Sequence, residues 1–193
     1  MPIPKQLLKI HDKTMIEIVV EKAVESRLDE VIVVLGHKFD IIRKYVEKYS
    51  SLSKPIKIVY NPDFRKGLST SLKAGLRAIS RESRAAIFIL ADQPMIKVET
   101  INRLIEIHSS MDCLIVAPVY RGRRGNPVLV DRRLFKEIFE LEGDIGARPL
   151  MKRYVDEVVY MATNDPGVVM DIDTMEDYLA LIAGDSESES GKG

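Results

Sequence analysis

Residues 30–36 read Glu-Val-Ile-Val-Val-Leu-Gly, a short run of β-branched and aliphatic residues that ends at a glycine. A continuous apolar run of this length is typical of a strand buried on both faces of a parallel sheet. On each side of it, apolar residues recur with the 3.6-residue period of an amphipathic helix. The helical positions are Ile16, Val19, Val20, Ala23 and Val24 before the run, and Ile41, Ile42, Tyr45, Val46 and Tyr49 after it. A strand between two such helices predicts an α/β fold.

The same alternation continues along the chain. Further strands are predicted at 57–61, 85–92, 113–118, 128–130, 157–163 and 168–170. Further helices are predicted around 68–79, 101–108, 134–141, 147–154 and 175–182. A basic, glycine-rich turn at 122–127 interrupts this alternation of strands and helices after Pro118. The pattern predicts an α/β, three-layer sandwich with a mostly parallel central sheet, in a Rossmann-like arrangement.

Composition limits the class of protein. The 193 residues fit one domain, expected over 1–183, and 46% hydrophobic with 30% charged residues excludes a wholly disordered chain. Lys plus Arg equals Asp plus Glu at 29 each, so no overall field favours nucleic acid or an anionic membrane. The single cysteine, Cys113, permits no internal disulfide, and no signal or membrane segment is evident. We expect a soluble cytoplasmic protein, with 184–193 as a disordered tail.

The first predicted element is a helix. Thr14 with Glu17 three residues later forms the capping-box pattern of a helix start. Doubly wound sheets normally begin with a strand whose carboxyl end carries a phosphate-binding turn. We therefore expect that this first strand and its loop are absent, or that the fold is an unusual variant.

Acidic residues follow two predicted strands. Asp92 ends the predicted strand 85–92, and Asp171 and Asp173 follow 168–170. Ligands in open α/β sheets lie outside the carboxyl ends of the strands, and carboxylates there can hold Mg²⁺. The alternative is that Asp92 only caps a turn or helix.

A second candidate site lies at 61–76. Gly67 permits a close approach or an unusual backbone conformation, and Ser69 and Ser71 stand at the start of a predicted helix. The free amides and positive dipole end of a helix start favour anionic ligands. A helix cap to which nothing binds explains the same pattern.

A third candidate is the basic loop 121–127, which Arg132, Arg133 and Lys136 continue. Arginine offers planar charged donors suited to a phosphorylated substrate, whereas a solvated surface loop is the alternative for any single arginine. No aromatic platform for nucleic acid accompanies the charge. Just downstream, two glycines frame Asp144, either as a shaped turn or as a helix cap.

Together these segments resemble the MobA/MocA-like nucleotidyltransferases. The motifs are, in order, Asp92-Gln-Pro94, Arg124-Gly-Asn-Pro127, Gly143-Asp-Ile-Gly-Ala-Arg148 and Asp171-Ile-Asp-Thr-Met-Glu-Asp177. In addition, 61–76 looks like the nucleotide-contacting segment of that family, and 5–8 like the end of its N-terminal phosphate-binding motif. The resemblance covers essentially residues 5 to 182, and its glycine-rich motifs look more like the cytidylyltransferase branch than the guanylyltransferase branch.

The resemblance implies a nucleotide-diphospho-sugar transferase-like fold. It also implies Mg²⁺-dependent transfer of CMP from CTP to molybdopterin, with release of pyrophosphate and with a molybdoenzyme or chaperone as a possible partner. The catalytic residues would be Lys5 and Asp92, and Asp92, Asp171 and Asp173 would be the metal ligands. Nucleotide binding would involve Lys5, Asn61, Gly67, Ser69, Ser71 and Asp92. Acceptor binding would involve Arg124, Gly125, Asn126, Pro127, Asp144 and Arg148.

The sequence departs from the family at its beginning. The strand and the glycine- and arginine-containing loop that precede the position of Lys5 in the family are not present, and Met175 stands where the family usually has proline. A misplaced start codon or a truncated chain is the first explanation. The alternatives are a transferase that uses GTP or another phosphorylated acceptor, and a degenerate homologue that binds nucleotide without catalysis.

Overall fold

The computed structural model describes residues 3–51 and 54–190. The α-helices are α1 (Met15–Glu25), α2 (Phe39–Glu47), α3 (Leu68–Ala78), α4 (Val98–Ser110), α5 (Phe135–Ile138), α6 (Arg148–Arg153) and α7 (Met175–Ser190). The strands are β1 (Lys9–Ile10), β2 (Lys13–Thr14), β3 (Val31–Leu35), β4 (Ile56–Tyr60), β5 (Ala85–Phe88), β6 (Ile115–Tyr120), β7 (Arg123–Arg124), β8 (Val128–Asp131) and β9 (Val158–Ala162). Short 3-10 helices include η1 (Lys5–Leu7) and η6 (Pro166–Val169).

The strands form two separate sheets beside the small β1–β2 hairpin. The larger sheet has the order β5-β8-β6-β7, and β9 pairs with β6. Because β8 is antiparallel to both β5 and β6, these two strands run in the same direction, and β9 is parallel to β6. The smaller sheet is the parallel pair β3 and β4. The strand directions therefore agree with the predicted mostly parallel arrangement, with β8 and β7 reversed.

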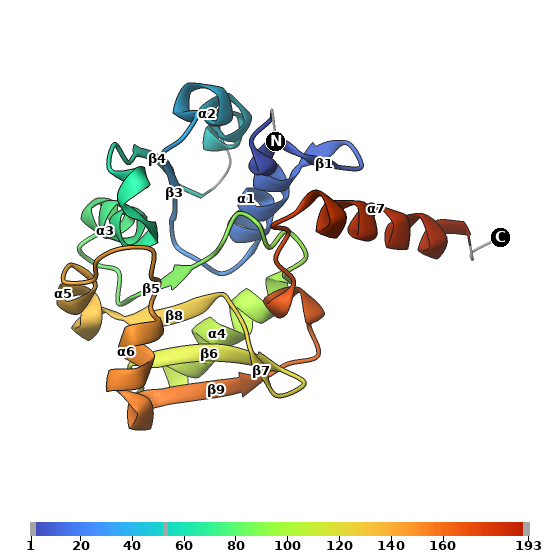
Figure 1. Cartoon of the computed structure of the whole chain (residues 1–193). Helices are drawn as coiled ribbons and strands as arrows, with labels where there is room; N and C mark the ends of the chain where they lie inside the picture. The colour runs from blue at the N-terminus through green and yellow to red at the C-terminus, as the bar shows by residue number, and fades with distance from the viewer. Residues whose placement is uncertain (1–2, 52–53, 191–193) are drawn as a thin grey trace.

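Helices lie on both faces of the larger sheet (Figure 1). Ile115 and Ala117 of β6 pack with α3, α5 and α6, whereas Val116 packs with Leu104 of α4. Odd-numbered residues of β3 pack against α1 and α2. This period-two alternation puts helices on both faces of the sheets and makes the three-layer α/β sandwich that the sequence predicts.

The beginning of α1 confirms the predicted capping box. The Thr14 amide and hydroxyl both donate to Glu17 Oε2, at 2.8 Å and 2.6 Å. Glu17 is buried, and its other oxygen accepts from Lys48. Although burial opposes the effect, the hydrogen bonds from Lys48 and Thr14 hold the pKa of Glu17 below its ordinary value.

Two local expectations differ from the structure. Residues 168–170 were predicted as a strand, but η6 covers Pro166–Val169 because Pro166 lacks an N–H and Asp165 caps the turn through the Gly167 amide. Residues 184–190, expected in a disordered tail, continue α7. Residues 191–193 of that predicted tail lie outside the described residues. Among the described residues, no helix has the length and apolarity to cross a membrane.

Candidate active site

Lys5 connects two carboxylates from distant parts of the chain. Its Nζ donates to Asp92 Oδ2 and to Asp173 Oδ1, each at 2.8 Å. Asp92 follows β5, Asp173 precedes α7, and Lys5 begins η1. Burial acts to lower the pKa of Lys5, but the hydrogen bonds to Asp173 and Asp92 raise it overall, so Lys5 is firmly cationic. The structure thus brings three predicted site residues together, with the carboxylates of Asp92 and Asp173 on the ammonium group of Lys5.

A second layer of contacts fixes these carboxylates. The Ile172 amide donates to the Asp92 carbonyl at 2.9 Å, and the Gln93 side-chain amide donates to Asp171 Oδ1. Asp171 is therefore directed to Gln93 rather than to Lys5. Gln93 is buried, and sequence reasoning did not select it, although it lies inside the Asp-Gln-Pro motif.

Two buried acceptors at this position lack a partner within the described part of the chain. They are Asp92 Oδ1 and Gln93 Oε1. Such atoms are costly to bury and indicate that a donor or cation binds there. The described ranges contain no group of three or more acidic, histidine or cysteine side chains arranged for a metal. Two carboxylates that converge on one cation nevertheless fit Mg²⁺, which uses few protein ligands and keeps waters and phosphates.

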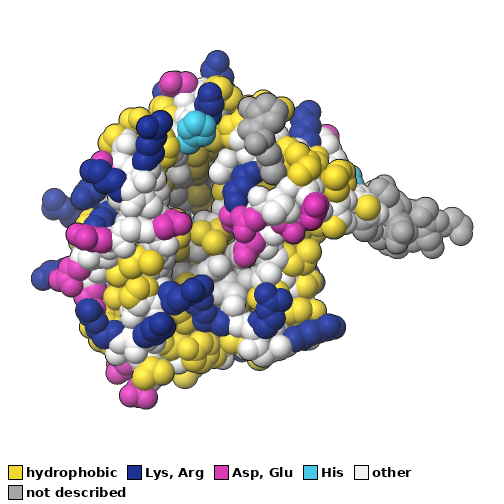
Figure 2. All heavy atoms as spheres, viewed as in Figure 1, with side chains coloured by type: hydrophobic (Ala, Val, Ile, Leu, Met, Phe, Trp, Pro, Cys, Tyr) yellow, Lys and Arg dark blue, Asp and Glu magenta, His cyan; other side chains and the backbone are white. Residues whose placement is uncertain are grey.

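A cavity of about 710 Å³ lies beside Lys5 and Asp173. Gly36, His37 and Lys38 after β3, and Ala91 after β5, also line it. Figure 2 shows this face of the molecule hollowed near its centre, with acidic and basic side chains at the rim. The hollow lies at the carboxyl ends of two strands, where ligands of α/β folds bind.

The predicted nucleotide segment comes together at the start of α3. Asn61 is buried, and its amide nitrogen donates to Thr70 Oγ1 at 2.8 Å and Ser71 Oγ at 3.1 Å. Its Oδ1 accepts from the Asp63 amide at 3.0 Å. The two bonds to Thr70 and Ser71 hold the end of β4 to α3, and the bond from Asp63 shapes the turn after the strand, so in this structure the Asn61 side chain positions the segment.

A second loop closes the amino end of α3. Asp144 Oδ1 accepts from the Leu68 amide at 3.1 Å, and the Gly143 carbonyl accepts from the Ser69 amide at 3.2 Å. A Cβ on Gly67, where φ is +105°, would lie 2.3 Å from the Gly143 carbonyl carbon, so only glycine allows this approach. Asp144, predicted to contact the acceptor, here caps α3. The hydroxyl of Ser69 is buried without a partner among the described residues.

The predicted acceptor loop is fixed through its backbone. The Gly125 amide donates to Pro118 O and the Asn126 amide to Val168 O, both at 2.8 Å. The Asn126–Pro127 peptide bond is cis. Burial and the nearby charge of Arg148 lower the pKa of Arg124, whose guanidinium contacts the sulfur of Met151. A half-buried arginine with an exposed second arginine beside it favours a bound anion, because the anion would offset both positive charges.

Lys and Arg side chains also gather on the surface over α6, β7 and the adjacent part of the large sheet (Figure 2). The site therefore has two parts, a Lys5–Asp92–Asp173 cluster beside the cavity and an arginine pair made of Arg124 on β7 and Arg148 on α6.

Comparison with known proteins agrees with this geometry. The model of a family described as the MobA-like NTP transferase domain matches residues 1–158. The chain is 22% identical over 175 residues to molybdenum cofactor cytidylyltransferase of Escherichia coli, covering 91% of this chain and 85% of that protein. It is 28% identical over 160 residues to the purine catabolism protein PucB of Bacillus subtilis, covering 81% and 77%.

Among solved structures, the fold is similar to Rv0371c of Mycobacterium tuberculosis in its complex with manganese. The TM-score is 0.77 at 26% identity, over 93% of this chain and 92% of that one. The architecture is thus nucleotide-diphospho-sugar transferase-like.

Proposed function

This chain belongs to the MobA-like NTP transferase family and is a nucleotidyltransferase, and on that premise we propose that it transfers CMP from CTP to a molybdopterin-type acceptor. The nucleophile is an oxygen of the acceptor's terminal phosphate. It forms a new bond to the α-phosphorus of CTP, the bond from that phosphorus to the β-phosphate oxygen breaks, and pyrophosphate leaves. The product is the diphosphate-linked pterin dinucleotide.

The observation that supports this proposal most is the position of Lys5 between Asp92 and Asp173 beside the cavity. Phosphoryl transfer requires little covalent participation from the protein, and its main needs are alignment and neutralisation of charge. Lys5 binds oxygens of the triphosphate and offsets the charge that develops on the leaving pyrophosphate. The buried Gln93 keeps Asp171 away from the phosphates and keeps the 92–93 segment in place.

Asp92 and Asp173 would hold the Mg²⁺. The unpartnered Asp92 Oδ1 is available as a further ligand atom. When bound, Mg²⁺ supplies Lewis-acid neutralisation of the phosphate oxygens. The manganese in the Rv0371c structure supports a divalent cation in this fold.

Arg124 and Arg148 bind the acceptor phosphate. Their mutual repulsion is relieved by a phosphate dianion, and the backbone bonds of Gly125 and Asn126 hold the loop in one shape. The motif Gly143–Arg148 and the similarity to the E. coli cytidylyltransferase favour CTP and a pterin acceptor. The product would then pass to a molybdoenzyme or its chaperone.

The test is pyrophosphate release by the 193-residue chain with Mg²⁺, molybdopterin and each of CTP, GTP, ATP and UTP. We expect turnover with CTP, and a loss of roughly 100-fold or more in kcat/KM for Asp92→Asn. Asp156→Asn, at an exposed position outside the site, serves as the matched control. Turnover with GTP alone would assign the guanylyltransferase reaction instead. No turnover with any nucleotide, from folded protein that still binds CTP, would assign a binding role without catalysis.

A further inference from the structure

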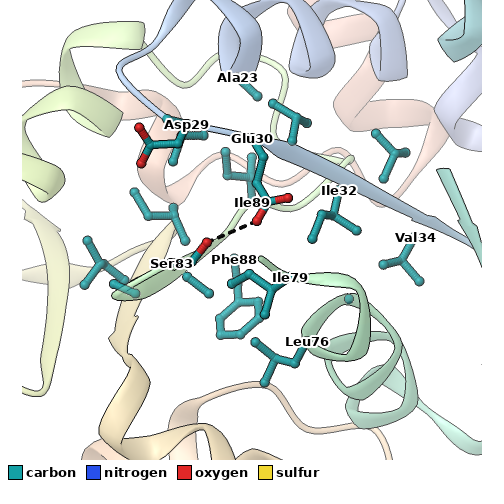
Figure 3. Close-up of a pocket in the computed structure, with 18 of the residues that line it drawn as sticks. Ala23, Asp29, Glu30, Ile32, Val34, Leu76, Ile79, Ser83, Phe88 and Ile89 are labelled. Atoms are coloured by element: carbon teal, nitrogen blue, oxygen red, sulfur yellow. Dashed lines mark hydrogen bonds between the residues drawn. The ribbon is translucent and has the colours of Figure 1, made fainter. Parts of the chain in front are cut away.

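A cleft separates the two sheets. Within the described residues, β3 pairs only with β4, and β5, at the end of its sheet, pairs only with β8. Residues of both strands line one cavity of about 450 Å³ between them. Figure 3 shows Ile32 and Val34 of β3, Leu76 of α3 with Ile79 just after that helix, and Phe88 of β5 around this space.

The two strands bordering the cleft run in the same direction. At their amino ends, Glu30 Oε1 accepts from the Ser80 amide at 2.7 Å. It also accepts from Ser83 Oγ at 3.1 Å (Figure 3). At their carboxyl ends, Gly36 and Ala91 line the same second cavity. The cleft is therefore flanked by two strand edges, both aligned along its length.

The burial of these strands is unusual for their sequence. Every residue from Ala85 to Ala91 is apolar, yet all of them are only half-buried, whereas β6 begins with four buried residues. Ile32 and Val34 on β3 are half-buried as well. A strand this apolar is normally covered on both edges. The cleft explains the exposure, because it leaves one edge of each strand open.

We propose that the cleft between β3 and β5 binds one extended apolar peptide segment, about as long as the five-residue β3, which pairs with both strands and joins the two sheets. The occupant is a strand, because two facing edges present unpaired backbone donors and acceptors that only another backbone satisfies along their length. Apolar side chains from α1 and α3 line both faces of the space, including Val20, Ala23, Leu72 and Leu76.

Charge restricts the occupant further. The charged lining residues all precede β3 or β5, at the amino-end mouth of the cleft, and are Arg27, Asp29, Glu30, Glu82 and Arg84. Apart from His108, which pairs with Asp131, the rest of the lining is apolar or small. The bound segment is therefore uncharged along its centre and rich in β-branched residues, which suit a half-buried pleated surface.

The experiment uses the whole chain and a fluorescent synthetic peptide with a Val-Ile-Val-Val-Leu centre and lysines at both ends for solubility. A matched peptide carries N-methyl groups on alternate backbone amides, which removes hydrogen-bond donors and keeps the side chains. We expect saturable one-to-one binding of the first peptide only. At a peptide concentration 100 times its dissociation constant, amide exchange in β3 and β5 should slow by roughly 100-fold.

A substitution localises the binding. Ile32→Lys places a charge in the cleft and should abolish peptide binding, whereas Ile41→Lys, at an exposed position of α2, should leave it unchanged. Because Ile32→Lys also affects folding, the comparison of the two peptides on the unaltered protein carries the test.

Other outcomes would overturn the proposal. Equal binding of both peptides would identify a site for apolar groups rather than a strand site. Absence of binding to a folded protein would also reject it. A dimer that the peptide does not dissociate, with β3 and β5 already protected, would show that a second copy is the occupant. None of these readouts uses catalysis, so the result is independent of the proposed function.

Discussion

At Lys5, one ammonium group pairs with two carboxylates, and removing it separates the role of the lysine from that of the carboxylates. In Lys5→Met, Asp92 and Asp173 lose the cation between them, so Mg²⁺ or Mn²⁺ should bind more tightly in the absence of nucleotide. CTP binding should weaken, and kcat/KM should fall by roughly 100-fold. Titration calorimetry with metal alone and with CTP measures both effects, and Lys9→Met, at an exposed position of β1, is the control. Weaker binding of both ligands would contradict separate roles.

Arg148 offers a test of the acceptor site. It is exposed on α6, so Arg148→Ala should leave the fold and CTP binding unchanged. Loss of one charged donor to a phosphate should raise KM for the acceptor by roughly 10-fold or more. Steady-state kinetics with the acceptor varied provide the measurement. Lys152→Ala, an exposed cation on the same helix, is the control. An unchanged KM for the acceptor together with weaker CTP binding would place Arg148 at the nucleotide instead.

At the scale of elements, the start of α3 depends on a carboxylate 76 positions away in sequence. Asp144→Ala removes the acceptor for the Leu68 amide and should lower the free energy of unfolding by about 1 kcal/mol, or about 2–4 °C in Tm. Asp144→Asn keeps an acceptor and should restore most of the loss. The neighbouring exposed Glu142→Ala should change Tm little. Equal stability of all three variants would show that this cap contributes nothing.

The start of α1 gives a pH-dependent effect. The folded state holds the pKa of Glu17 below 4.5, so its stabilisation is present above that pH and is lost as the pH falls through the folded pKa. Glu17→Gln keeps a capping-box acceptor but loses the charge, and should cost about 1.5 kcal/mol at neutral pH. Thermal melts from about pH 7 to about pH 3 should show this difference shrinking in acid. Glu25→Gln, exposed at the end of α1, should give no such trend.

The elements that sequence predicted well are those whose pattern is local. The β-branched run at 31–35 and the apolar stripe of α1 identify themselves because burial on a regular element imposes their period. At 166–169 the residues are equally apolar, but the turn depends on Asp165 and the missing N–H of Pro166. The Asp165 side chain also accepts hydrogen bonds from the Lys97 amide and the Thr100 hydroxyl. These partners lie more than 60 positions away in the sequence, so no local pattern reveals them.

At the site, likewise, the residue identities were predictable from local motifs, whereas the contacts between them were not. Lys5, Asp92 and Asp173 were each selected for their motif and for the strands that two of them follow, but their meeting depends on packing between residues 168 positions apart. The sequence allowed a capping role for Asp144, but not the finding that it caps α3, which lies far earlier in the chain. Nor could the sequence select Gln93 as the partner of Asp171. Each contact depends on which loops become neighbours after folding.

For the whole molecule, the two sheets should differ in local stability. The β6 and β8 strands are central and buried, whereas β3 and β4 form a two-stranded sheet beside the cleft. Hydrogen exchange in the unliganded protein should therefore be faster in β3 than in β6, by roughly tenfold or more. Equal exchange rates in the two strands would mean that the protein opens as one cooperative unit despite the cleft.

The pairing of β5 with β8 also bears on how the chain is made. Phe88 pairs with Val128, so during synthesis β5 leaves the ribosome about 40 residues before its partner exists. At about 5–20 residues per second, this wholly apolar strand waits roughly 2–8 s without that neighbour. Aggregation during rapid expression should therefore begin at 85–91, and slower translation should not relieve it, because the delay lengthens with every slowed codon between the two strands.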